Sequence, residues 1–133
     1  MVRVFWGWET DVPRILVVDD NAMMRTVMRS TLERAGHQVI LADNGEKALK
    51  AAAEGGPFDL VVTDVQMPRM GGVDFVRALR KSRPDLKVLM ISGAVDEGQM
   101  HGYATDKSLG ISATLEKPFT ADKLASKVAE ILG

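Results

Sequence analysis

Short apolar runs alternate with segments of helical periodicity along this chain, and that alternation limits the fold more than any other feature of the sequence. The predicted strands are 15–18, 38–42, 60–63, 86–91 and 112–115. The predicted helices lie at 23–35, between Asn44 and Gly55, between Pro68 and Pro84, at 99–109 and at 121–132. Strand–helix alternation predicts an α/β fold, a parallel sheet covered on both faces by helices with right-handed crossovers. Strands that are apolar throughout agree with burial on both faces.

The chain is long enough for one domain with its own core, since it has 133 residues and a hydrophobic content of 46%. We expect this domain at 13–133 and an N-terminal tail at 1–12. The tail contains both tryptophans, Trp6 and Trp8. One interpretation is a loose tail or a start site placed too early. The other is an added strand or a hydrophobic docking patch, because exposed tryptophans usually find a partner.

Charge and composition exclude several classes of function. The formal net charge of −1 provides no overall field that would attract nucleic acid or an anionic membrane, so we expect neither partner. The absence of cysteine excludes disulfides and thiolate chemistry and fits a cytoplasmic location. No apolar run approaches the ~18 residues that a membrane-spanning helix requires.

Polar residues stand where the predicted strands end. The first strand is followed by Asp19 and Asp20, the third by Asp64, the fourth by Ser92 and the fifth by Lys117. The carboxyl ends of parallel strands share one edge of the sheet, where doubly wound folds bind their ligands. Three carboxylates close together raise one another's pKa unless a cation neutralises them. Oxygen ligands without His or Cys select a hard divalent ion, Mg²⁺ or Mn²⁺.

One of these carboxylates can be a nucleophile toward phosphorus, because aspartyl phosphates are known covalent intermediates. The metal and Lys117 would then balance the charge of the transferring group. A structural alternative is that Asp19, Asp20 and Asp64 are helix N-caps, a common role of Asp after a strand. That alternative leaves the lysine and proline at the end of the fifth strand unexplained.

At these residues the chain closely resembles the receiver domain of two-component response regulators. The resemblance extends from Arg14 to about Leu132, and its motifs agree in order and spacing. They are Ile15-Leu16-Val17-Val18-Asp19-Asp20-Asn21, Asp64-Val65-Gln66-Met67-Pro68 with Gly71-Gly72, Ile91-Ser92-Gly93 and Lys117-Pro118-Phe119. The resemblance implies a flavodoxin-like sheet of five strands in the order 2-1-3-4-5 with five helices.

The resemblance also implies a role for each site residue. Asp64 would be the phosphoacceptor, Lys117 would pair with the phosphoryl oxygens, and Ser92 would be the switch hydroxyl that moves toward them. Mg²⁺ would be bound by Asp20, Asp64 and the backbone carbonyl of Gln66, with Asp19 acting through water. The bond between Lys117 and Pro118 would be cis, an isomer that only X-Pro bonds adopt cheaply.

The implied partners are a sensor histidine kinase or histidine phosphotransfer domain as donor and an unknown downstream protein. The chain would assist its own phosphorylation and dephosphorylation without being an enzyme for other substrates. Two other functions stay open. One is a pseudo-receiver used only for docking. The other is a phosphohydrolase with an aspartyl nucleophile, which would carry Asp-x-Asp after its first strand instead of the adjacent pair found here.

Two departures from the family concern the route of the signal. Thr114 occupies a position that is usually aromatic, and the segment after Ser92 is longer than usual and contains Gly93, Gly98 and Gly102. Threonine is too small to report the switch by swinging inward, whereas glycine makes the backbone easy to redirect. We therefore expect the segment from Gly93 to Tyr103 to respond to phosphorylation. His101 and the methionines Met67 and Met70 are interpreted as surface residue and packing residues, respectively.

Overall fold

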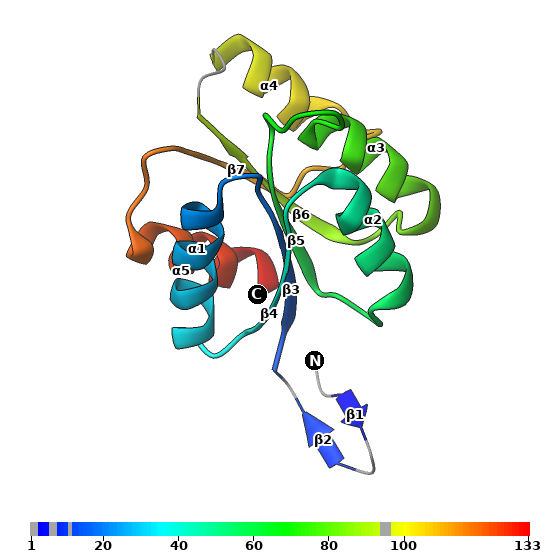
Figure 1. Ribbon diagram of the computed structural model, residues 1–133, viewed down its shortest axis with the longest axis vertical. Helices are drawn as coiled ribbons and strands as arrows, with labels where there is room; N and C mark the ends of the chain where they lie inside the picture. Colours follow the sequence, from blue (N-terminus) through cyan, green and yellow to red (C-terminus); the bar gives the residue numbers. More distant parts are fainter. Residues whose placement is uncertain (1–2, 6–7, 11, 94–96) are drawn as a thin grey trace.

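A five-stranded parallel sheet lies between two layers of helices in the computed structural model (Figure 1), which describes residues 3–5, 8–10, 12–93 and 97–133. The strands of this sheet are β3 (Arg14–Val18), β4 (Gln38–Ala42), β5 (Leu60–Asp64), β6 (Lys87–Ser92) and β7 (Ala113–Glu116). The helices are α1 (Ala22–Arg34), α2 (Gly45–Glu54), α3 (Gly72–Ser82), α4 (Glu97–Thr105) and α5 (Ala121–Leu132). The spatial order β4-β3-β5-β6-β7 is 2-1-3-4-5 in chain order, so the predicted fold is confirmed.

Both faces of the sheet are buried because successive side chains of each central strand enter different cores. In β3, Leu16 and Val18 belong to the core under α2, α3 and α4, whereas Ile15 and Val17 belong to the core under α1 and α5. Figure 1 shows the same division of the helices between the two faces. All four side chains are fully buried, and full burial of such a side chain stabilises the fold by roughly 1.5–3 kcal/mol. Uninterrupted apolar strands are therefore what this architecture requires.

Uncharged side chains, not the acidic residues, cap the N-termini of α1, α2 and α5, and the N-cap of α3 is Gly71. Oδ1 of Asn21 accepts the backbone N–H of Met24 at the start of α1, and Oδ1 of Asn44 accepts that of Lys47 at the start of α2. At the start of α5, Oγ1 of Thr120 accepts the N–H of Lys123. The alternative that made Asp19, Asp20 and Asp64 helix N-caps is therefore wrong.

Helix α4 begins two residues earlier and ends four residues earlier than its apolar spacing predicts, at Glu97 and Thr105 instead of at 99 and 109. The cause of the early end is Asp106. Its backbone carbonyl accepts the N–H groups of both Leu109 and Gly110, and its carboxylate accepts the N–H of Ser108 at 2.9 Å. Asp competes in this way with helical hydrogen bonding. Leu109 is still fully buried, which explains why its spacing resembled that of a helix.

Arg80 joins α3 to two loops at the edge of the sheet opposite the strand carboxyl ends. Its guanidinium donates to the backbone carbonyls of Arg83, Leu86, Leu109 and Gly110 at 2.6–3.1 Å. Burial lowers the pKa of this side chain, and the charge of Asp85 opposes that effect. Arg80 thereby holds the connection between α4 and β7 against α3.

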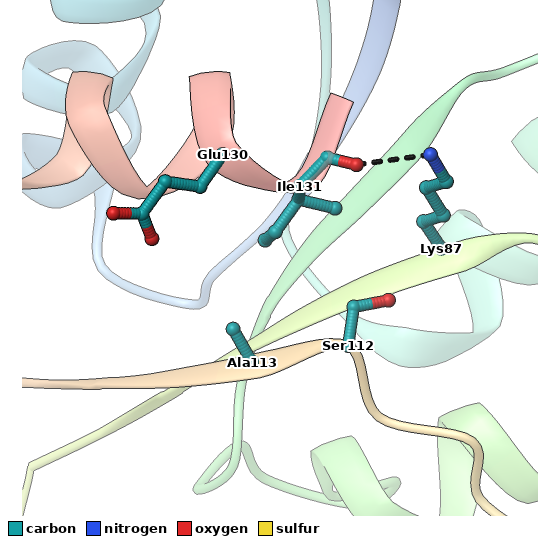
Figure 2. A pocket seen from close by; sticks show the side chains of 5 residues that line it. All are labelled: Lys87, Ser112, Ala113, Glu130 and Ile131. Carbon is teal, nitrogen blue, oxygen red and sulfur yellow. Dashed lines mark hydrogen bonds between the residues drawn. The ribbon is translucent and has the colours of Figure 1, made fainter. Parts of the chain in front are cut away.

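Lys87 ties the end of α5 to the sheet at the same edge. Its Nζ donates to the backbone carbonyl of Ile131 at 2.9 Å (Figure 2). Because the last carbonyls of a helix have no partner within the helix and carry partial negative charge, a lysine is favourable there. A shallow cavity of about 340 Å³ lies here, lined by Lys87, Ser112, Ala113, Glu130 and Ile131.

The N-terminal segment forms a separate sheet. Strands β1 (Arg3–Phe5) and β2 (Trp8–Thr10) pair antiparallel with each other, and the five-stranded sheet does not include them. The N-terminal segment therefore does not add a strand to the main sheet. Trp6 and the side chain of Trp8 lie outside the described part, so their docking role and the boundary between tail and domain stay predictions. Across the described residues, no helix combines the length and the apolar character that crossing a membrane requires.

Candidate functional site

The strand order brings the predicted site residues to one edge of the sheet. From β3 the chain crosses to β4 on one side and then to β5 on the other, so the carboxyl ends of β3 and β5 adjoin at the point where the order reverses. Asp19 follows β3 directly, Asp64 is the last residue of β5, and Ser92 is the last residue of β6. Lys117 follows β7, and its N–H donates to the carbonyl of Ser92 at 2.7 Å. Crevices of this kind bind ligands in doubly wound folds.

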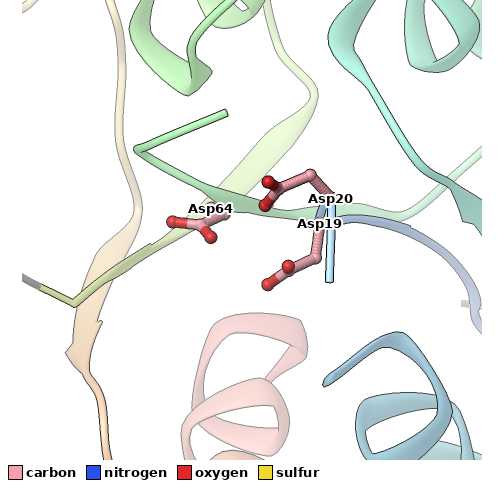
Figure 3. Close-up of side chains that lie close together, drawn as sticks. All are labelled: Asp19, Asp20 and Asp64. Carbon is pink, nitrogen blue, oxygen red and sulfur yellow. The ribbon is translucent and has the colours of Figure 1, made fainter. Parts of the chain in front are cut away.

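Three carboxylates converge in this crevice (Figure 3). Asp19, Asp20 and Asp64 each offer a carboxylate oxygen, and these three oxygens lie within 4.8 Å of one another. Asp19 is fully buried and Asp64 is 5% exposed, whereas Asp20 is exposed. The cluster predicted from the strand ends is thus assembled, with its open side at Asp20.

Lys117 bridges two of the three carboxylates. Its Nζ lies 3.0 Å from Oδ2 of Asp64 and 3.2 Å from Oδ2 of Asp19. Burial lowers the pKa of Lys117, but the hydrogen bonds and charges of Asp64 and Asp19 outweigh burial and raise it above its ordinary value. The ammonium is therefore charged at neutral pH and partly compensates the two carboxylates.

The Asp19 side chain is buried at the edge of the cluster. Burial raises its pKa, and the negative charge of Asp64 acts in the same direction. The backbone N–H of Asn21, which donates to Oδ1 at 2.8 Å, and the charge of Lys117 oppose that increase. A cation added to the cluster would relieve the remaining like-charge repulsion.

The residues present fit a hard divalent cation. All three ligand candidates are carboxylates, the ligand type that Mg²⁺ and Mn²⁺ take in proteins. In the described part of the chain, the carboxylate of Asp20 has no hydrogen bond or salt bridge of its own. It is accordingly available as a ligand without the loss of an existing contact.

Gln66 and Ser92 lie where the motifs predict, but their roles remain predictions. The backbone N–H of Gln66 donates to Oδ1 of Asp64 at 3.1 Å, which holds the turn after β5. Ser92 is 2% exposed and lies one residue beyond Ile91, the partner of Asp64 in the pairing of β5 with β6. Thr114 is half-buried on β7 opposite Met90.

The remaining sequence predictions concern one peptide bond, two methionines and one histidine. The bond between Lys117 and Pro118 is cis. Met67 and Met70 pack against the core under α2 and α3, and His101 is exposed, as predicted.

Two residues have supporting roles in the site that were not predicted from the sequence. Asn21 caps α1 and also holds the carboxylate of Asp19 through its N–H. Arg25, one turn into α1, donates from Nη1 to the backbone carbonyl of Asp19 at 2.8 Å. A signal was available, because an arginine early in a helix whose first turn has no acidic residue is unfavourable for the helix dipole and needs another explanation.

Comparison with known proteins identifies the family. Residues 15–129 match the response regulator receiver domain. The chain is 32% identical to a chemotaxis protein CheY homolog of Campylobacter jejuni over 123 residues, which are 90% of this chain and 92% of that protein. Among solved structures, chemotaxis protein CheY4 of Vibrio cholerae superposes with a TM-score of 0.82 at 30% identity, covering 90% of this chain and 98% of that chain.

Other relatives are much longer than this chain. It is 36% identical over 116 residues to the CAI-1 autoinducer sensor kinase/phosphatase CqsS of Vibrio cholerae, but spans only 17% of that protein. It spans 48% of the alkaline phosphatase synthesis transcriptional regulatory protein PhoP of Bacillus subtilis. What these matches share with the chain is the region of the receiver domain. The chain belongs to the response regulator receiver domains of two-component signalling.

Proposed function

We propose that Asp64 is the phosphoacceptor of this receiver domain and that its phosphorylation changes the affinity of the chain for a downstream protein. The observation that carries the assignment is the position of Asp64. It ends the central strand inside the carboxylate cluster, with Oδ2 at 3.0 Å from the Lys117 ammonium. Of the three carboxylates, it alone lies on β5, between the acidic pair of β3 and the hydroxyl of Ser92 on β6.

The reaction is a transfer between two nucleophiles. A carboxylate oxygen of Asp64 forms a bond to phosphorus while the bond from phosphorus to the imidazole nitrogen of a donor phosphohistidine breaks, and the electron pair of that bond stays on the imidazole. Lys117 is already within hydrogen-bonding distance of the acceptor and would follow the charge onto the phosphoryl oxygens. Asp64 needs no general base, because its carboxylate is the nucleophile.

Asp20 and Asp64, with the backbone carbonyl of Gln66, would hold Mg²⁺ or Mn²⁺ directly, and Asp19 would act through water. When bound, the ion supplies positive charge to the phosphoryl oxygens and aligns donor and acceptor. The chain's own contribution is to keep Asp19 and Asp64 in place through Lys117 while the carboxylate of Asp20 stays open to solvent.

Ser92 would convert phosphorylation into a change of shape. A phosphoryl group adds close to two negative charges and three acceptor oxygens at the end of β5. The Ser92 hydroxyl can satisfy one of those oxygens by moving toward Asp64, and the segment that follows Ser92 would move with it. The result would be a shift between two conformations that already exist.

The donor is proposed to be a sensor histidine kinase or a histidine phosphotransfer domain, consistent with receiver domains in general and with the sensor kinases among the relatives. On this proposal the chain works in the cytoplasm as a phosphoacceptor that assists its own phosphorylation and dephosphorylation. Turnover of other substrates is not part of it.

The test is incubation with acetyl phosphate and Mg²⁺, followed by measurement of the intact mass. The wild-type chain should gain the mass of one phosphoryl group, and chelation of the metal should prevent the gain. Asp64→Asn should show no gain and an unchanged circular dichroism spectrum. Asp74→Asn is the matched control, since Asp74 is exposed on α3 and the same substitution there should leave labelling intact.

Other outcomes separate the alternatives. Full labelling of Asp64→Asn would overturn the assignment. A wild-type chain that never gains mass, from acetyl phosphate or from a phosphorylated histidine partner, would favour a docking module without phosphotransfer. Steady hydrolysis of diverse phosphomonoesters would instead favour a phosphohydrolase.

A further inference from the structure

Arg25 makes an unusual contact for a side chain at the edge of an acidic cluster. It is half-buried on α1, and its Nη1 donates to the backbone carbonyl of Asp19 at 2.8 Å. A guanidinium beside carboxylates ordinarily forms paired bonds with one of them. Here the hydrogen bond goes to a neutral carbonyl, so the side chain holds the backbone instead of neutralising charge.

That carbonyl belongs to the peptide unit between Asp19 and Asp20. A peptide unit is planar, so fixing its oxygen also fixes its nitrogen and the Cα of the following residue, which is Asp20. The next peptide unit is held as well, because the N–H of Asn21 donates to Oδ1 of Asp19 at 2.8 Å. The two peptides that flank Asp20 are thus fixed from opposite sides by Arg25 and Asp19.

Asp20 needs such support because its carboxylate has none. In the described residues no hydrogen bond or salt bridge holds that side chain, whereas Asp19 and Asp64 are both held by Lys117. An exposed carboxylate without a partner samples several rotamers, and ordering it on metal binding costs conformational entropy. Among the hydrogen bonds of the described residues, those that bear on Asp20 hold the backbone on each side of it and not its carboxylate.

Asp20 borders a cavity that Arg25 also lines. This cavity of about 360 Å³ is lined by Asp20, Arg25, Asp43, Asn44, Pro68 and Arg69. Although Arg25 and Asp20 line the same space, they form no salt bridge with each other in the described structure. The carboxylate therefore stays free for a cation while the guanidinium is engaged at the backbone.

We propose that Arg25 is a positioning residue for metal binding, which holds the peptide between Asp19 and Asp20 so that the Asp20 carboxylate is aimed at the cluster. This inference rests on the proposed function, because it takes Asp20 to be a metal ligand. The positive charge of Arg25 acts in the opposite direction, since a guanidinium close to a cation site weakens cation binding. The sign of the effect of removing Arg25 therefore distinguishes positioning from charge.

The experiment measures the Kd for Mg²⁺ by calorimetry on the full chain. Arg25→Met removes the donor and the charge but keeps most of the aliphatic length, and it should raise the Kd about tenfold, as losses of groups that orient a metal ligand typically do. Arg25→Lys restores one donor and the charge and should fall between wild type and Arg25→Met. Arg29→Met is the matched control, because Arg29 lies one turn further along α1 and pairs with Glu33 at 2.6 Å, away from the site.

A double-mutant cycle separates positioning from general destabilisation. If Arg25 acts through Asp20, Arg25→Met should change the Kd by less than about twofold in an Asp20→Asn background, because coupled residues do not contribute additively. A residue that merely stabilises α1 would lower the melting temperature of the metal-free chain and leave the Kd unchanged. If Arg25→Met does not fold, the same cycle is carried out with Arg25→Lys.

The outcomes are distinct from those that test the phosphoacceptor. An unchanged or lower Kd in Arg25→Met, with normal Mg²⁺ binding by the wild-type chain, overturns this inference and leaves the proposed function intact. Equal effects of Arg25→Met in the wild-type and Asp20→Asn backgrounds also overturn it. A wild-type chain that binds no Mg²⁺ refutes the metal site itself, and this inference with it.

Discussion

Replacing Gly72 with alanine should disrupt the junction between α3 and the proposed phosphoacceptor. Gly72 is the first residue of α3, and its N–H donates to the carbonyl of Val65 at 2.8 Å. A Cβ at this position would lie 2.1 Å from the backbone oxygen of Asp64 and 2.9 Å from Cα of Val65. All of the contacted atoms are backbone, so no flexible side chain can move aside.

The size of the effect follows from these distances. To bring the Cβ to a tolerable separation, the start of α3 must move away from β5 by about 1 Å, which strains the hydrogen bond from Gly72 to Val65. Overpacking costs roughly 1–3 kcal/mol, and a collision with backbone atoms falls at the upper end of that range. The loss of a buried hydrogen bond costs about 1 kcal/mol more. Alanine recovers up to about 1 kcal/mol through its helix propensity. The expected net loss is about 3 kcal/mol in the free energy of unfolding.

Urea denaturation measures this loss, and Gly102→Ala is the control. Gly102 lies in α4, where an added Cβ has nothing within 4 Å, so the same substitution should stabilise the fold by up to about 1 kcal/mol. Labelling by acetyl phosphate should slow in Gly72→Ala, because a shift of about 1 Å at a reacting group can cost a factor on the order of one hundred. A Gly72→Ala variant within about 1 kcal/mol of wild type would refute the steric argument.

Two further predictions concern pH and the route of the signal. Burial lowers the pKa of His37, whose buried Nδ1 has no hydrogen-bond partner among the described residues. The neutral imidazole therefore contributes its full stability above the ordinary pKa of 6.5, and this stability is lost as the pH falls from there through the folded-state pKa. Urea denaturation at about pH 7.5 and about pH 5.5, on either side of that value, should show a decline in wild type that His37→Gln reduces; equal declines in both would contradict it. For the signal, hydrogen exchange with and without beryllofluoride and Mg²⁺ should change most between Gly93 and Tyr103, because Arg80 holds the connection after α4 in place. Strong changes at Thr114 and α5 with none in that segment would show that the signal takes another route.

The elements of the fold were predictable because the forces that define them are local. Each central strand is an apolar run that ends at a polar residue, and each helix has an apolar spacing that a glycine, a proline or a cap interrupts. The end of α4 was the exception. Apolar spacing continues to Leu109, but the hydrogen bonds of Asp106 close a turn that replaces the last turn of the helix. The spacing of apolar residues does not distinguish this turn from a helix.

The members of the site were predictable for a related reason. In a parallel sheet every strand ends at the same edge, so Asp19, Asp20, Asp64 and Ser92 had to share that edge once the strands were assigned. The family motifs added the expected role of each residue. Neither argument indicates how the three carboxylates differ in burial or in hydrogen-bonding partners.

Only the tertiary structure decided those differences. Asp19 is buried and bridged to Asp64 by Lys117, a residue 98 positions further along the chain. Asp20 is exposed beside Arg25, and its carboxylate has no partner among the residues that the structure describes. Asp19 and Asp20 are chemically identical neighbours, and no local pattern separates them. Their environments differ because β5, Arg25 of α1 and Lys117 after β7 approach the end of β3 differently. The burial, charge and hydrogen bonds of a side chain depend on everything that packs against it.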